Sequence, residues 1–229
     1  MNHLNLHPLG NNRKVLLMRG VFGTIALTMF FYTIQYIPLA SAVTIQYLSP
    51  IFTALFAAIY LKEKMKIKQW LYFGMSFAGV ALLKGFDERV SITFMLIGII
   101  SAMFSGMAYT CIRQLKDTEH PIVVVFYFPL VATPISGILT YFQWVQPIGS
   151  DWLLLILMGI FTQIAQILMT KGLQSAVINK IISVKYIGTF WALGFGFILF
   201  GEVYTLISLA GIALVILGVI LNLKVKESY

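Results

Sequence analysis

The chain has 229 residues, of which 59% are hydrophobic and only 10% are charged, and its mean hydropathy is +0.90. A water-soluble domain cannot hide that much apolar surface, so the composition excludes that class and predicts an all-α, polytopic membrane helix bundle. The net charge of +8 does not indicate nucleic-acid binding, because basic residues gather in the cytoplasmic loops of membrane proteins. Cys111 is the single cysteine, which rules out an internal disulfide and a cysteine-based metal cluster.

A polar tail, residues 1–14, opens the chain and predicts a cytoplasmic segment rather than a signal peptide. Eight apolar segments follow, and each is long enough to predict a membrane-spanning helix. They cover residues 15–37, 39–61, 67–84, 91–112, 122–142, 152–170, 176–200 and 204–222. The third is the shortest, and the lysines at its ends can extend to the lipid headgroups. Residues 223–229 form a second polar tail.

Basic residues predict the orientation of these spans. With residue 1 in the cytoplasm, thirteen lysines and arginines fall on the cytoplasmic side, and only Lys84 and Arg89 fall on the other. This bias agrees with the positive-inside rule and predicts a multi-pass protein of the plasma (inner) membrane with both termini in the cytoplasm. Lys185 is left over, because it lies in the middle of an apolar run.

An internal repeat relates the two ends of the chain. Residues 16–82 match residues 155–221 without a gap when the sequence is shifted by 139 positions. The matched polar pairs are Gln35 with Gln174, Tyr47 with Tyr186, and Glu63 with Glu202. The loop LKEKMKIK of the first copy carries four lysines, whereas FGEVYTLI of the second carries none. The copies are therefore expected to have opposite orientations, a signature of secondary transporters that bind their substrate between the repeats.

The first copy is shorter than the second. Two spans, 91–112 and 122–142, precede the second copy and have no counterpart before the first. We therefore expect an N-terminal repeat of three helices over 15–84 and a C-terminal repeat of five over 91–222, with two helices missing from a complete five-plus-five arrangement.

Two stretches carry a resemblance to a known family. The first is AVTIQYLSPIFTALFAAIYLKEKMKIKQWLYFGMSFAGVALL, and the second is its echo INKIISVKYIGTFWALGFGFILFGEVYTLISLAGIALVILGVIL. Pro50, Glu63 and the pairs Gly79-Val80, Gly201-Glu202 and Gly218-Val219 fit the pattern of the EamA family of the drug/metabolite transporter superfamily, which the chain resembles over nearly its whole length. Gly188-Thr189 stands where the second repeat usually has proline. The resemblance implies ten helices and transport of small organic solutes or metabolites.

Lys185 is the first candidate for a substrate-binding residue. A lysine at the centre of a spanning helix costs about 2.5–3.5 kcal/mol on insertion scales, so it should face the bundle interior or a wet cavity. It occupies the position that Gln46 holds in the first repeat, and each is followed by a tyrosine. Lys185 either binds an anionic group or titrates during transport, or it extends to the cytoplasm or hydrogen-bonds a neighbour structurally.

Other polar or aromatic residues within the spans are candidates for the same cavity. They are Gln46, Tyr47, Ser49, Tyr109, Gln163, Gln166, Tyr186 and Thr189. Each can instead pack or hydrogen-bond between helices. Glu63 and Glu202 lie at membrane borders, where a carboxylate can stabilise a helix N-terminus or act in gating, and Pro50 is assigned with them. We expect no metal, no cofactor and no catalytic residues.

The leading hypothesis is a carrier that moves a small organic solute or metabolite by alternating access. Its partners would be a solute with an anionic or polar group and the lipid bilayer but no nucleic acid, and a homo-oligomer is left open. The alternative is a truncated or degenerate membrane protein with a structural or assembly role. A membrane enzyme is the weakest hypothesis, because the sequence contains no catalytic constellation.

Overall fold

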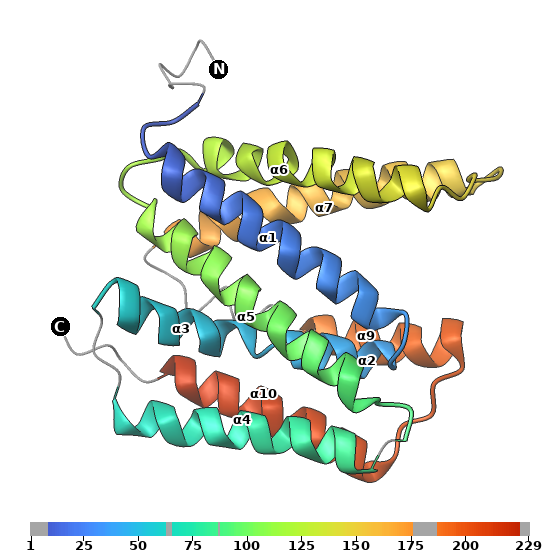
Figure 1. Cartoon of the computed structure of the whole chain (residues 1–229). Coiled ribbons are helices and arrows are strands. Elements are labelled where there is room, and N and C mark those ends of the chain that lie inside the picture. Colours follow the sequence, from blue (N-terminus) through green and yellow to red (C-terminus); the bar gives the residue numbers. More distant parts are fainter. Residues whose placement is uncertain (1–8, 63–65, 87, 176–186, 225–229) are drawn as a thin grey trace. The chain divides into compact units, whose positions relative to one another are not determined.

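A computed structural model describes residues 9–62, 66–86, 88–175 and 187–224 (Figure 1). Within these ranges the chain forms nine helices and no strand. The helices are α1 (Arg13–Ile34), α2 (Leu39–Gln46), α3 (Ser49–Tyr60), α4 (Ile67–Phe86), α5 (Ile92–Gln114), α6 (Pro121–Phe142), α7 (Asp151–Gln174), α9 (Ile187–Phe200) and α10 (Leu206–Lys224). The predicted all-α membrane helix bundle is confirmed.

Five helical segments are long and apolar enough to cross a membrane, if α2 and α3 count as one. They are Arg13–Ile34, Leu39–Tyr60, Ile92–Gln114, Pro121–Phe142 and Asp151–Gln174. In α9 and α10 the apolar stretches are shorter, and the first part of the predicted span 176–200 lies outside the described residues. The remaining helix, α4, has 20 residues but begins Ile-Lys-Gln, which makes its first turn polar.

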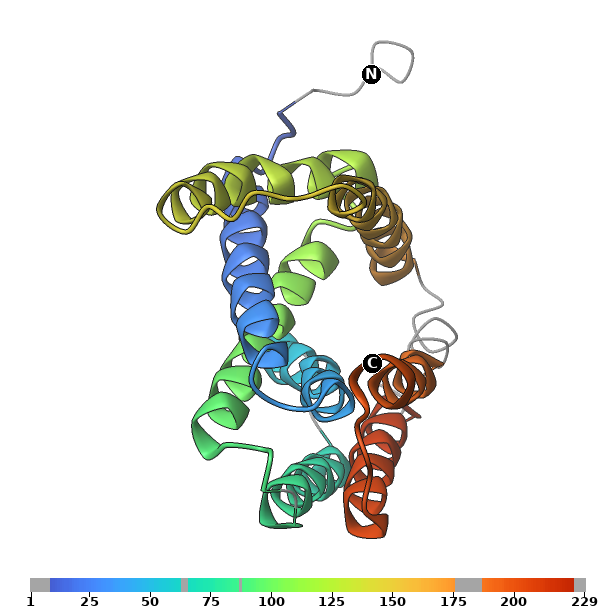
Figure 2. The same cartoon turned by 90° about the vertical axis from the view of Figure 1, so that its right-hand side faces the viewer.

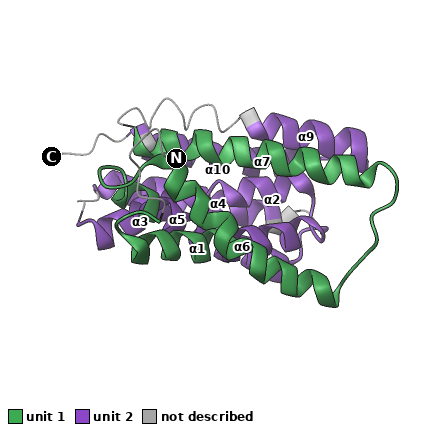
Figure 3. Ribbon diagram, turned by 90° about the horizontal axis from the view of Figure 1, so that it is seen from above, with its two compact units in different colours: residues 1–24, 111–178 green, residues 25–110, 179–229 purple. Residues whose placement is uncertain are grey.

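Two compact units make up the chain (Figure 3). The first comprises residues 1–24 and 111–178, and the second comprises residues 25–110 and 179–229. Both α1 and α5 contribute to each unit.

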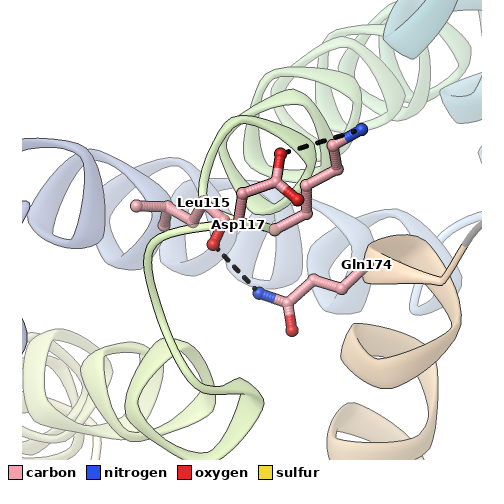
Figure 4. Close-up of polar contacts among 4 residues, drawn as sticks. Leu115, Asp117 and Gln174 are labelled. Carbon is pink, nitrogen blue, oxygen red and sulfur yellow. Dashed lines mark hydrogen bonds and ion pairs between the residues drawn. The ribbon is translucent and has the colours of Figure 1, made fainter.

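In the first unit, polar contacts fix the ends of the helices. The Glu119 carboxylate binds the backbone just before α1. Its Oε1 accepts hydrogen bonds from the N–H groups of Asn11 and Asn12 at 2.6 Å each. A carboxylate at this position satisfies free N–H groups and favours the positive end of the helix dipole. At the C-terminal end of α7, the Gln174 amide donates to the carbonyl oxygens of Leu115 (3.4 Å) and Glu119 (3.2 Å), as Figure 4 shows for Leu115. Gln174 thus has a structural role in the connection after α5.

In the second unit, a buried apolar core joins α2, α3, α4, α5 and α10. Ile45, Leu48 and Ile51 are at most 1% exposed, and aromatic side chains such as Phe52, Phe73 and Phe77 pack around them. Among the described helices of this unit, α4 and α10 form the most extensive packing contact, and they lie side by side in Figures 1 and 2.

Glycines bring α4 and α10 into close contact. A Cβ on Gly79 would come within 2.7 Å of the Gly211 carbonyl oxygen, and one on Gly218 within 2.9 Å of the Tyr72 carbonyl oxygen. The neighbouring contacts are of Gly79 with Val215 and of Gly218 with Ser76. Because backbone atoms stand opposite these glycines, any larger residue would force the helices apart.

The contacts between α4 and α10 have the symmetry of the sequence repeat. Adding 139 to Tyr72, Ser76 and Gly79 gives Gly211, Val215 and Gly218, so each Gly79 contact has a counterpart made by Gly218. Residues further along α4 contact residues earlier in α10, since Tyr72 meets Gly218 and Gly79 meets Gly211. The two helices are therefore antiparallel. The Gly-Val pairs pack together here, with Val80 2% exposed and Val219 fully buried.

We predict that Gly79→Ala lowers the apparent melting temperature of the purified protein in detergent. The added methyl group meets backbone atoms of α10, and overpacking of this kind costs about 1–3 kcal/mol. Gly74→Ala is the matched control on the same helix, because nothing lies within 4 Å of its Cβ position. Alanine there gains roughly 0.5–1 kcal/mol of helix stability. Equal melting temperatures for the two variants would contradict the close packing of α4 on α10.

Candidate substrate site

The span Leu39–Tyr60 is broken where α2 gives way to α3. Pro50 lies in the first turn of α3 and lacks the N–H group that would bond the Gln46 carbonyl four residues earlier. The chain turns through Tyr47 and Leu48. The Tyr47 N–H is shared between the Val43 (3.2 Å) and Thr44 (3.1 Å) carbonyls, and the Leu48 N–H bonds the Ile45 carbonyl (3.0 Å) in the tighter three-residue pattern. Pro50 is buried, and because it cannot donate a hydrogen bond to the Gln46 carbonyl, the regular helix is interrupted just before it.

Tyr47 connects this break to the start of α9. Its side chain is only 4% exposed, and a Cβ added to Gly188 would come within 2.7 Å of its hydroxyl oxygen. That hydroxyl also lies beside Thr189, which is 2% exposed. Two of the predicted cavity residues, Tyr47 and Thr189, are therefore neighbours, and Gly188 leaves the space that the tyrosine occupies.

Gln46 is held by two serines of α5. Its Nε2 donates to Ser105 Oγ at 2.6 Å, and its Oε1 accepts from Ser101 Oγ at 3.2 Å. The single Ser101 hydroxyl proton is shared between Gln46 Oε1 and the Ala26 carbonyl oxygen, which lies 2.7 Å from Ser101 Oγ. The serines are four residues apart and so share one face of α5. Sequence reasoning missed them, although their helical spacing within an apolar span was a signal.

Two buried hydroxyl groups near the break make no hydrogen bond within the described part of the chain. They belong to Ser49, which is fully buried two residues after Tyr47, and to Thr189, whose hydroxyl lies beside that of Tyr47 without reaching hydrogen-bond geometry. By contrast, the Thr44 and Thr53 hydroxyls each bond a carbonyl of their own helix. A buried hydroxyl without a partner costs about 1–3 kcal/mol. These two groups are therefore suited to bind something that enters the site.

Glu202 lies in the connection between α9 and α10 and caps another helix. Its Oε1 accepts from the Leu39 N–H at 2.7 Å, at the start of α2, and its Oε2 accepts from the Tyr204 hydroxyl at 2.6 Å. The N-cap position of α2 is Pro38, which provides no side-chain cap. One of the two roles considered for Glu202 from the sequence was to stabilise a helix N-terminus. In the structure it contacts the N-terminus of α2.

Tyr204 supports the same carboxylate. Burial, together with the hydrogen bond to the Glu202 carboxylate and its negative charge, raises the pKa of Tyr204 well above the usual tyrosine value. Its hydroxyl therefore remains a donor across the physiological range. The start of α10 is capped separately, because Thr205 Oγ1 accepts from the Ser208 N–H at 3.1 Å.

The remaining predicted residues belong to the first unit or to another part of α5, or they lie outside the described residues. Gln163 and Gln166 belong to the first unit, where Gln163 is exposed on α7 and Gln166 is half-buried. Tyr109 is half-buried on α5. Lys185, Tyr186 and Glu63 lie outside the described residues.

Arg19 is a charged residue of the first span that the orientation count placed on the cytoplasmic side. It lies within α1 and is only 2% exposed, so the count falls from thirteen residues to twelve. Its Nη2 donates to Gln166 Oε1 at 2.9 Å. The sequence contained the signal, since Arg19 falls inside the predicted span 15–37.

Comparison with known proteins identifies the family. Residues 2–84 and 92–224 match the EamA-like transporter family. The chain belongs to this family. It is therefore a multi-pass membrane transporter of small solutes.

Relatives of this EamA-like transporter include proteins named as transporters or carriers. The chain is 30% identical over 215 residues to pseudopaline exporter CntI of Pseudomonas aeruginosa strain UCBPP-PA14, covering 93% of this chain and 76% of that one. It is 27% identical over 224 residues to mouse (Mus musculus) solute carrier family 35 member G1, covering 90% of this chain and 60% of that one. It is 25% identical over 160 residues to a riboflavin transporter of Vibrio cholerae, covering 68% and 53%.

A solved crystal structure supports the fold. It aligns with a TM-score of 0.67 at 20% sequence identity, covering 96% of this chain and 79% of that one. A likeness at this identity concerns the arrangement of helices and carries no information on the solute.

We predict that Glu202→Ala accelerates hydrogen exchange of the Leu39 amide on the order of tenfold, because the amide loses its acceptor at the start of α2. Hydrogen-exchange mass spectrometry of the purified protein measures this rate. Glu88→Ala is the control, since Glu88 is an exposed acid in the connection after α4. Unchanged exchange at Leu39 in the Glu202 variant would show that the cap does not stabilise α2.

Proposed function

We propose that the transporter binds its solute at the break between α2 and α3 and moves it by alternating access. The observation that carries this proposal is the pair of buried hydroxyls, Ser49 and Thr189, without a hydrogen-bond partner in the described residues. Broken helices supply substrate sites in secondary transporters, because the interruption frees polar groups at membrane depth. A polar group of the solute would satisfy both hydroxyls.

Gln46 and Tyr47 would complete this site. Gln46 is held in place by Ser101 and Ser105, which limits the side-chain entropy lost when a solute binds. Tyr47 offers a hydroxyl and an aromatic face at the contact with Gly188. Tyr109, Tyr186, Gln163 and Gln166 remain candidates for contacts made at other stages of transport.

An anionic or polar solute is the preferred substrate class. Lys185 matches Gln46 in the repeat, and an ionisable residue within a spanning segment is a functional candidate by default. Relatives named for pseudopaline export and riboflavin transport agree with a small organic solute. We propose that Lys185 contacts an anionic group of that solute.

Glu202 would hold the start of α2 against the connection between α9 and α10 until the two repeats move. Its bond to the Leu39 N–H ties the start of α2 to the connection between α9 and α10. Moving one repeat against the other would require that this bond breaks, and Glu63 is the equivalent residue of the first repeat.

We further propose an inner-membrane location with both termini in the cytoplasm. The bias of twelve basic residues against two still supports this orientation. Fluorescence of a green fluorescent protein fused after Tyr229 tests it, because an exported fusion stays dark.

Transport assays on reconstituted protein test the proposed site. Proteoliposomes are loaded with an isotope-labelled metabolite extract, and the solutes that leave are identified by mass spectrometry. We predict that Thr189→Val slows export at least several-fold without lowering the melting temperature, because the replaced hydroxyl has no partner in the described residues. Lys185→Ala is expected to slow export of anionic solutes and to spare neutral ones.

Thr44→Val is the matched control for Thr189→Val. Thr44 is fully buried in α2, but its hydroxyl bonds the Ala40 carbonyl at 2.7 Å and so has no need of a solute. If Thr189→Val exports every solute at the wild-type rate, the site at the break is wrong. If wild-type protein moves nothing in the extract, a structural or assembly role becomes the better account.

A further inference from the structure

Arg19 belongs to a buried polar cluster in the first unit, separate from the residues at the α2–α3 break in sequence and element. Its Nη2 donates to Gln166 Oε1 of α7, and its guanidinium carbon lies 5.0 Å from the centroid of the Phe128 ring of α6. Three helices, α1, α6 and α7, thus surround one guanidinium that is 2% exposed.

Two glycines of α1 leave room for this arrangement. A Cβ on Gly23 would come within 2.5 Å of Arg19 Nη1 and 3.1 Å of Phe128, so the guanidinium lies over the glycine one turn later in the helix. A Cβ on Gly20 would come within 2.7 Å of the Tyr127 carbonyl oxygen, which shows how closely α6 approaches α1. The helix is therefore shaped to keep the arginine between itself and its neighbours.

Thr170 provides a second, independent observation. It lies four residues after Gln166 and so on the same face of α7, one turn along. Its side chain is fully buried, and its hydroxyl makes no hydrogen bond within the described residues. A helical threonine commonly bonds a carbonyl one turn back, as Thr24, Thr33 and Thr44 do in this chain. Thr170 instead keeps a donor and an acceptor for another partner.

We propose that Arg19, Gln166 and Thr170 bind a carboxylate or phosphate group of the transported solute at a stage of transport other than its binding at the α2–α3 break. A guanidinium matches such a group with two parallel N–H donors, and its charge makes those hydrogen bonds stronger than neutral ones. The Gln166 amide and the Thr170 hydroxyl add uncharged donors beside it. This inference rests on the proposed transport function and specifies the substrate class.

Ligand-dependent melting tests the inference without requiring transport. The full chain is placed in nanodiscs of phosphatidylcholine, and succinate and glycerol 3-phosphate are titrated as probes. We expect a saturable rise in melting temperature with these anions and none with succinamide or glycerol, because only a ligand that binds the folded state stabilises it. No rise with either anion would overturn the proposal.

Thr170→Val is the decisive variant, because it removes a hydroxyl that has no partner in the described chain. The melting temperature without anion is expected to stay the same or rise, while the apparent affinity for the anion falls about tenfold. Arg19→Gln is expected to abolish the rise, and Thr44→Val serves as the control with a satisfied hydroxyl. Wild-type anion affinity in Thr170→Val, or in an Arg19→Gln variant that folds, would overturn the proposal.

Nanodiscs that contain phosphatidylglycerol distinguish a solute from a lipid headgroup. If phosphatidylglycerol raises the melting temperature through Arg19 and the soluble anions do not, the occupant is a lipid and the assignment to the solute is wrong. Loss of anion binding in the variants with export of neutral solutes intact supports the inference. Anion binding by a wild-type protein that exports nothing would contradict the transport function and leave the anion site standing.

Discussion

A polar group that is buried in a membrane-spanning bundle must find its partner inside the protein, because the surrounding lipid offers none. Most of the described helices obey this constraint through their own backbone, and Thr33, Thr44 and Thr53 show how hydroxyls do the same. We propose that exceptions to this constraint mark functional positions. Ser49, Thr170 and Thr189 keep buried hydroxyls without a hydrogen-bond partner in the described residues.

Close helix packing makes these exceptions possible. Gly79 and Gly218 bring α4 and α10 together through symmetric contacts, so these two helices are closely packed within the second unit. The interrupted span α2–α3 contacts α9 through Tyr47 and Gly188. The carboxylate of Glu202 then fixes the N-terminus of α2. The close packing of α4 on α10 and the Glu202 contact with α2 thus lie on different helices.

Sequence patterns predicted the helices well, because apolar length reports directly on them. The contacts of Gly79 and Gly218 follow the 139-residue shift of the repeat, but their close packing and the break before Pro50 were not predicted. Side-chain partners were harder to predict. The serines that hold Gln46 come from α5, which has no counterpart in the first copy of the repeat, and the Glu202 carboxylate reaches across to α2. Arg19 was missed because a basic residue six positions after the helix start resembles a loop residue in a charge count.

Chemical accessibility of Ser49 tests the central claim, that the break between α2 and α3 is the site reached alternately from each side of the membrane. The native thiol is removed with Cys111→Ser, a cysteine is placed by Ser49→Cys, and a membrane-impermeant maleimide is applied to spheroplasts and to inverted vesicles. Ser101→Cys is the control, because that hydroxyl is buried and bonded to the Ala26 carbonyl. The account predicts that position 49 reacts from both sides while position 101 does not. A position 49 that reacts from neither side would contradict it.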